Sequence, residues 1–253
     1  MKRSVLLVLA LLAAMLSCSI KEDRTGCPCN LTIVLVEAGG PDGEDLVLGI
    51  SGLPDERLSG AVIPEMVERT VVKGIHRVTA FSGDAGMILR AGVLSVPYGS
   101  ACGPLMARAE SIECLSEEAE DTVRLRKQYM ALTFRADASC AGISVRSSWN
   151  GLTVNDLTPV PGAYRAMARG TAPGEFKVLL PRQGDASMVA DILGGDGAVI
   201  QTLPVGSMLE KAGYDFSAAN LDDAIICLDV VSPGGFSVIV QEWGEAEESE
   251  VNV

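Results

Sequence analysis

Apolar and polar positions alternate over short runs along most of this chain, which predicts strands. In residues 30–36, Leu31, Ile33 and Leu35 alternate with Thr32 and two valines, and the second set is apolar only towards the end of the run. Residues 128–136 and 143–147 repeat this period of two. That spacing places successive side chains on opposite faces of a strand. We therefore expect about 13 to 15 short strands.

The other expected strands have the same short length and lie between residues rich in Gly and Pro. We place them at 47–50, 69–73, 75–81, 87–89, 93–96, 105–109, 175–180, 187–193, 198–203, 225–231 and 236–242. Asn150-Gly151 is the strongest hairpin-turn signal, and 159–173 is expected to be a long loop rich in Pro, Gly and Ala. One helical turn is expected around 208–211, ended by Gly213.

This pattern has no long helix and no strand–helix alternation, so it predicts an all-β protein made of two sandwiches in tandem. We place the boundary near the acidic run 116–121. The expected parts are a signal peptide over 1–17, a tether over 18–29, an N-terminal sandwich over 30–121 and a C-terminal sandwich over 122–253.

The N-terminus has the order of an export signal. Lys2-Arg3 precedes an apolar run over 5–16, which is shorter than the roughly 20 residues that a membrane-spanning helix needs. Cys18 follows the small residue Ser17, as at a bacterial lipoprotein site, although a plain signal peptide with a nearby cysteine is the alternative. A lipid on Cys18 would hold the mature chain on a membrane without spanning it.

The charge of the chain argues against some partners. The net charge is −13, and removal of the signal with Lys2 and Arg3 would make it −15. Such a surface disfavours nucleic acid and anionic lipid, and it suits solubility outside the cell.

Cysteine usage fits the same compartment. If Cys18 carries lipid, six cysteines remain, and the sequence alone cannot pair them. Disulfides or buried thiols are expected rather than metal ligation, because Cys27-Pro-Cys29 has no second ligand cluster. Cys102 and Cys114 are close enough in sequence to clip a local loop. The six cysteines are Cys27, Cys29, Cys102, Cys114, Cys140 and Cys227.

The residues do not favour an enzyme, and we predict no catalytic residue, cofactor or metal. His76 is the sole histidine and falls in an expected strand, without a serine elbow. Asp222-Asp223 lacks the spacing of a calcium loop and is expected to be a solvated link, and Glu117-Glu118 a charged surface. Trp243 follows an apolar strand and is expected to close the end of a sandwich core.

Several segments, taken in order, resemble one known family. They are the start 18–28 with the strand 31–35, residues 123–127 leading to Phe134, and the closing segments 208–216, 221–231 and 236–243. Together they are similar to the FimB-type fimbrium anchor subunits of the Bacteroidales. Cys29 departs from the family pattern.

The resemblance implies a fold of two transthyretin-like sandwiches. It also implies a lipid-anchored outer-membrane subunit at the base of a fimbrium. This subunit would hold the shaft pilin by strand or edge pairing and would influence the length of the shaft. Related shaft and tip pilins lose an N-terminal strand by proteolysis, whereas anchors keep theirs. No clear arginine cleavage site separates the sandwiches, although Arg124 and Arg126 lie near the boundary.

Two other functions remain open. A surface lipoprotein that captures glycan or protein would need a loop-lined pocket with exposed aromatic residues, for which Tyr98, Tyr164 and Tyr214 are the candidates. The other open function is that of a secreted hydrolase.

Overall fold

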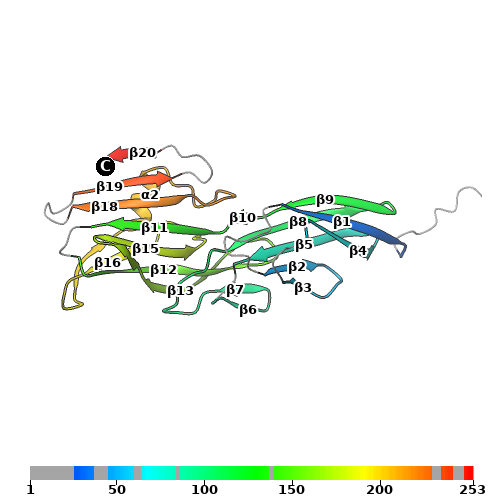
Figure 1. Ribbon diagram of the computed structural model, residues 1–253, viewed down its shortest axis with the longest axis horizontal. Helices are drawn as coiled ribbons and strands as arrows, with labels where there is room; N and C mark the ends of the chain where they lie inside the picture. Colours follow the sequence, from blue (N-terminus) through cyan, green and yellow to red (C-terminus); the bar gives the residue numbers. More distant parts are fainter. Residues whose placement is uncertain are drawn as a thin grey trace, which may run out of the picture.

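The computed structural model describes residues 26–36, 45–59, 64–83, 86–136, 140–229, 235–241 and 248–252. Within these ranges the chain is almost entirely β, with one short helix, so the expected all-β class is confirmed. Figure 1 shows two lobes that follow one another along the long axis of the molecule. No helix among the described residues is long and apolar enough to cross a membrane.

The first sandwich pairs a three-stranded sheet with a five-stranded sheet. The small sheet has the order β4-β1-β9, and the large sheet has the order β10-β8-β5-β2-β3. Their strands are β1 (Pro28–Val36), β2 (Leu46–Ile50), β3 (Glu56–Leu58), β4 (Met66–Val72), β5 (Gly74–Ser82), β8 (Met106–Cys114), β9 (Glu118–Arg124) and β10 (Arg126–Lys127).

The core of this sandwich follows from the period of two. Leu31 and Ile33 of β1 are fully buried against residues of the opposite sheet such as Leu48 and Val78. Burying each such side chain contributes roughly 1.5–3 kcal/mol. The alternation along β1 therefore fixes which face of the strand points inward.

The second sandwich is built from two larger sheets. One has the order β14-β15-β11-β18-β19-β20, and the other has the order β17-β16-β12-β7-β6, with β13 also paired to β12. Helix α2 (Val205–Lys211) buries Met208 and Leu209. The strands are β6 (Ile88–Arg90), β7 (Val93–Ser95), β11 (Tyr129–Arg135), β12 (Gly142–Thr153), β13 (Pro159–Met167), β14 (Arg169–Ala172), β15 (Glu175–Pro181), β16 (Val189–Leu193), β17 (Val199–Leu203), β18 (Asp223–Asp229), β19 (Gly235–Gln241) and β20 (Glu248–Asn252).

The hairpin β6–β7 connects the two lobes. It follows β5 in sequence, yet β7 pairs with the far end of β12, where Leu94 lies opposite Leu152. These two leucines pack with Val47, Phe81 and other residues of the first sandwich in a second apolar cluster. Phe81 lies on the face of β5 opposite to Val78 and Ala80, so β5 contributes to two cores.

Three local expectations were wrong. Asn150-Gly151 lies inside β12 and does not form a hairpin turn. The glycine has a different role: a Cβ at this position would lie 2.1 Å from the Leu94 carbonyl oxygen, so only glycine lets β7 approach so closely. Residues 159–173 are not a loop: β13 runs through most of them and tolerates proline outside the main sheet path. The acidic run 116–121 enters strand β9 instead of linking two units.

The pairing of the strands shows that the chain crosses from the first sandwich to the second at Gln128, a point that we call the passage. Its neighbours β10 and β11 belong to different sheets. The polar residues around it are called the seam: Lys127, Gln128 and Arg182, which are buried, and Asn220 and Asp223, which are half-buried. The Lys127 side chain is 0% exposed, and its ammonium ion pairs with the Asp223 carboxylate. The same oxygen of Asp223 accepts a hydrogen bond from the Ala131 amide at 2.7 Å.

The seam is held by side chains from distant segments. Arg182 donates to the Gln128 side-chain oxygen at 2.7 Å and to the Ala218 carbonyl at 2.7 Å. The Asn220 side chain accepts from the Lys127 amide at 2.9 Å. These hydrogen bonds provide partners for polar groups that are shielded from water. They therefore offset the free-energy cost of burying polar groups at the passage.

We predict that Asp223→Ala destabilises the protein by about 3–5 kcal/mol, the cost of breaking a buried ion pair. Lys127→Met is expected to cost less, because the Asp223 side chain is 28% exposed and water can solvate its charge, whereas Lys127 is fully buried. Urea unfolding of each variant measures the difference.

The control is Arg135→Met, which removes a largely exposed partner of Glu175 and is expected to cost about 0–1 kcal/mol. An equal cost for Asp223→Ala and this control would contradict the role given to the seam.

Candidate functional site on the first strand

The strand β1 begins at Pro28, so the expected tether is two residues too long at its C-terminal end, and β1 occupies the centre of its sheet. It pairs antiparallel with β4 from Pro28 to Val34 and parallel with β9 from Asn30 to Val36. The ladder is extended at both ends, where the Cys27 carbonyl accepts from Lys73 at 2.9 Å and the Val36 carbonyl accepts from Leu125 at 3.2 Å. A pull along the strand would therefore load many hydrogen bonds at once, because they run across the direction of the pull.

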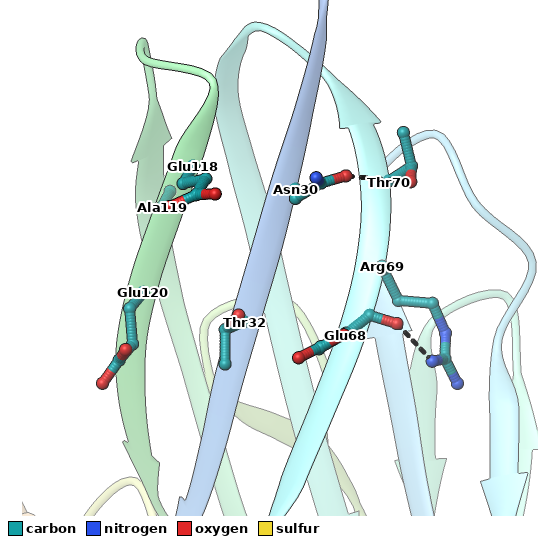
Figure 2. Close-up of a pocket in the computed structure, with 8 residues that line it drawn as sticks. All are labelled: Asn30, Thr32, Glu68, Arg69, Thr70, Glu118, Ala119 and Glu120. Atoms are coloured by element: carbon teal, nitrogen blue, oxygen red, sulfur yellow. Dashed lines mark hydrogen bonds between the residues drawn. The ribbon is translucent and has the colours of Figure 1, made fainter.

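The outer face of this sheet forms a shallow acidic groove of about 670 Å³, which we call the β1 groove. Figure 2 shows Asn30 and Thr32 of β1 along its floor, with Glu68 of β4 on one side and Glu118 and Glu120 of β9 on the other. The register places Thr32 opposite both Glu68 and Glu120. The carboxylates of Glu68 and Glu120 lie on either side of β1, so the negative charge of this face disfavours an anionic ligand.

An ion pair closes one side of the first sandwich. Arg69 on β4 reaches across to Glu56 on β3, with its Nε 3.1 Å from the carboxylate, and it also donates to the Glu68 carbonyl at 2.6 Å. Because β4 and β3 lie in different sheets, this contact links two edges. On the other side, β9 carries exposed carboxylates, which discourage pairing by another strand.

A second groove of about 640 Å³ lies at the seam between the sandwiches, and we call it the seam groove. Half-buried Trp149 and Phe216 line it together with polar groups that include Gln183 and Arg182. Burial lowers the pKa of Arg182, but the arginine is held by hydrogen bonds to backbone carbonyls, which is a structural use of its charge.

The structure separates the expected site residues. Cys18, the lipidation candidate, and Trp243 lie outside the described residues. His76 lies on β5, where its two ring nitrogens face the carbonyls of Ser51 at 3.1 Å and Val72 at 2.6 Å. Asp223 corrects our expectation of a solvated link, since it is the partner of buried Lys127.

The three candidate tyrosines have different environments. Tyr98 is 65% exposed, whereas Tyr164 and Tyr214 are buried. Tyr164 donates to the Leu179 carbonyl at 2.8 Å and Tyr214 donates to the Asp222 carbonyl at 2.9 Å. Burial raises the pKa of both phenols, so they remain protonated donors within the core. The aromatic residues that line a groove are instead Trp149 and Phe216, which the sequence analysis missed because no spacing signal connects them.

The expected local clip between Cys102 and Cys114 is not formed. Cys102 precedes β8 and donates to the Gly103 carbonyl at 3.2 Å, whereas Cys114 ends that strand. A strand advances about 3.3 Å per residue, so β8 holds the two thiols far apart. Burial raises the pKa of Cys102 to about 12, which keeps its thiol protonated and unreactive. Among the described residues, no group of histidine, cysteine and carboxylate side chains is arranged to hold a metal.

Comparison with known proteins relates this chain to others through its fold. No protein-family model matches the sequence, and no curated protein matches it. Solved structures do match, over most of the chain and nearly all of their own length.

Three examples show the extent of the match. A Bacteroides thetaiotaomicron protein with a proposed polysaccharide-binding role has a TM-score of 0.61 at 10% identity, covering 88% of this chain and 98% of its own. The fimbrial anchor protein Mfa2 of Porphyromonas gingivalis has a TM-score of 0.55 at 10% identity, covering 86% and 98%. The tip fimbrial protein Mfa3 of the same organism has a TM-score of 0.53 at 12% identity, covering 89% and 100%. The shared feature is the fold of two β-sandwiches.

Proposed function

We propose that this protein is a subunit of a fimbrium, held in the outer membrane by a lipid on Cys18, and that it attaches the fimbrial shaft to the cell and limits its length. The observation that carries the proposal is the position of β1, which follows the tether directly and is paired on both sides. The similarity in fold to a fimbrial anchor and a fimbrial tip protein supports it.

The proposed load path starts at the lipid and enters the first sandwich through β1. The strand is central in its sheet, so it can be withdrawn only by breaking two ladders and exposing Leu31 and Ile33, which are fully buried. The passage into the second sandwich is then held by the seam and by the second apolar cluster around Leu94 and Leu152. This construction suits a subunit that keeps its first strand and bears a pull.

The proposed contact with a shaft pilin is the edge strand β17. It pairs with β16 on one side, and within the described strands its other side has no partner. Its residues carry no charge, and Val199 and Ile200 are 54% and 52% exposed. An exposed apolar edge without charge is a surface on which a strand of another chain can add, in contrast to the acidic edge β9.

Capture of a glycan is the second candidate function, and the seam groove favours it. Trp149 and Phe216 offer apolar surface beside amide and guanidinium groups, which is the usual composition of a small-molecule site. The proposed polysaccharide-binding role of the similar Bacteroides thetaiotaomicron protein supports this candidate.

The anchor proposal predicts that Cys18→Ala releases the protein, with its attached fimbriae, from outer membranes. The variant loses the residue that would carry the acyl chains, and each buried methylene contributes about 0.8 kcal/mol to membrane binding. Fractionation and co-purification of pilin with each form measure this. The proposal is wrong if no pilin accompanies the wild-type protein or if fimbriae stay attached without Cys18.

The docking proposal predicts that Ile200→Lys lowers co-purification of pilin at least about tenfold, because a charge on an edge strand opposes strand addition. The matched control is Ile75→Lys, since Ile75 is also exposed but lies in the other sandwich, on β5, where it is paired with Glu113 of β8. Equal retention of pilin by both variants would exclude β17 as the contact.

The glycan candidate predicts that Trp149→Ala weakens retention on insoluble polysaccharide about tenfold or more, as loss of a central aromatic contact costs about 2 kcal/mol. Tyr98→Ala is the control, because Tyr98 is exposed and does not line the groove. Thermal unfolding of both variants reports any damage to the packing of Trp149 against Gly184. If the wild-type protein is not retained, this candidate is rejected.

A further inference from the structure

We infer that Cys29 and Cys114 form a disulfide that ties the first strand to the opposite sheet of its sandwich. Cys29 lies on β1 and Cys114 is the last residue of β8. The inference rests on the proposed surface location, because exported proteins pass through oxidising compartments, whereas a reducing cytosol would keep both thiols free.

The topology brings the two cysteines to the same corner. Cys29 is paired with Val71 near the end of β4, and Cys114 is paired with Gly74 at the start of β5. Only Lys73 lies between these two strands, which belong to different sheets, so the sheets converge at this corner. A disulfide needs Cα atoms within about 7 Å of each other and side chains that face one another. A converging corner of a sandwich meets this requirement more readily than its middle, where sheets lie about 10 Å apart.

The two side chains are free thiols in the structure, and both are buried at this corner. Both are 0% exposed and belong to the same apolar cluster, and Cys29 is near enough to the Cys114 thiol to raise its pKa. The other buried thiols have different neighbours: Cys102 and Cys140 donate to the carbonyls of Gly103 and Gly142. Because the corner is shielded from water, a disulfide there replaces two weakly polar thiols with an apolar group.

The bond forms by thiol–disulfide exchange with a protein disulfide oxidase of the export compartment. The thiolate of one cysteine attacks the oxidase disulfide and releases one oxidase thiol, which leaves a mixed disulfide. The second cysteine, after losing its proton, attacks the mixed disulfide and releases the other oxidase thiol. The two cysteines lose two protons and two electrons in total, and the oxidase disulfide takes them up as two thiols.

Burial explains when this exchange takes place and why its product persists. Burial, together with the neighbouring Cys29, raises the pKa of the Cys114 thiol to about 11, so little thiolate exists once the sandwich has closed. Oxidation therefore precedes the final packing of β1. Afterwards the same burial keeps reductants away from the bond.

The bond has a mechanical consequence. It lies at the N-terminal end of β1, next to the tether, and it joins this strand to β8 in the larger sheet. A pull from the tether is then carried by a covalent bond as well as by the two ladders. β1 can no longer be withdrawn or exchanged for the strand of another chain, whatever the partner of the protein is.

Peptide mapping of the full exported chain tests the inference. The protein is recovered from cell envelopes without reductant, and its free thiols are blocked with N-ethylmaleimide. The tryptic peptide with Cys29 also contains Cys27, because no Lys or Arg lies between Arg24 and Arg57. We therefore expect Cys27→Ala to retain the link to the Cys114 peptide and Cys29→Ala to lose it. Reduction is expected to lower the urea midpoint of the Cys27→Ala protein but not that of Cys29→Ala.

Blocked thiols at both positions in protein from the envelope would overturn the inference, as would a link from Cys27. If the Cys29→Ala variant fails to fold, the map of the Cys27→Ala protein decides alone. If the protein is found only in the cytosol, the proposed function fails instead. The purified full chain is then refolded in a glutathione redox buffer, where absence of the Cys29–Cys114 link rejects the disulfide.

Discussion

The arrangement of the two sandwiches depends on one buried ion pair, between Lys127 and Asp223. A lysine with no exposed side-chain surface is tolerable only with a partner, and burial lowers the pKa of this ammonium while the carboxylate opposes that shift. Asp223 also accepts from the amide of Ala131, so one carboxylate fixes the end of β10 and the start of β11. The passage between the lobes is thereby a defined structure rather than a flexible linker.

The second apolar cluster adds an independent contact between the lobes. The hairpin β6–β7 extends a sheet of the second sandwich, while Leu94 packs against Phe81 of the first. Because this hairpin pairs with one sandwich and packs against the other, the interface between the sandwiches resembles a hydrophobic core. Such an interface opposes motion of one sandwich relative to the other. The proposed load path from β1 to β17 crosses this interface, so the packed residues would share the pull with the covalent chain at Gln128.

Prediction from sequence worked where a strand has one buried face and failed where a glycine or proline had a tertiary reason. The alternation in β1 identified this strand, since burial of every second side chain leaves a direct trace in the sequence. The alternation over residues 128–136 also identified β11, although the first four residues of β11 are all buried. Gly151 resembled a turn residue, but it is small because β7 passes close to it. Of the candidate site, β1 could be predicted, whereas the seam groove could not, because Trp149 and Phe216 meet only in the folded chain.

The sequence by itself determined the all-β class and most strands, and it gave the expectations that nucleic acid is not a partner and that Cys18 carries an anchor. These properties depend on neighbouring residues and on composition. Only the tertiary structure decided which cysteines share a buried corner, which aspartate pairs with the buried Lys127 and which sheet receives the hairpin β6–β7. Six cysteines allow 15 pairings, and a choice among them needs the distances between strands that lie far apart in sequence.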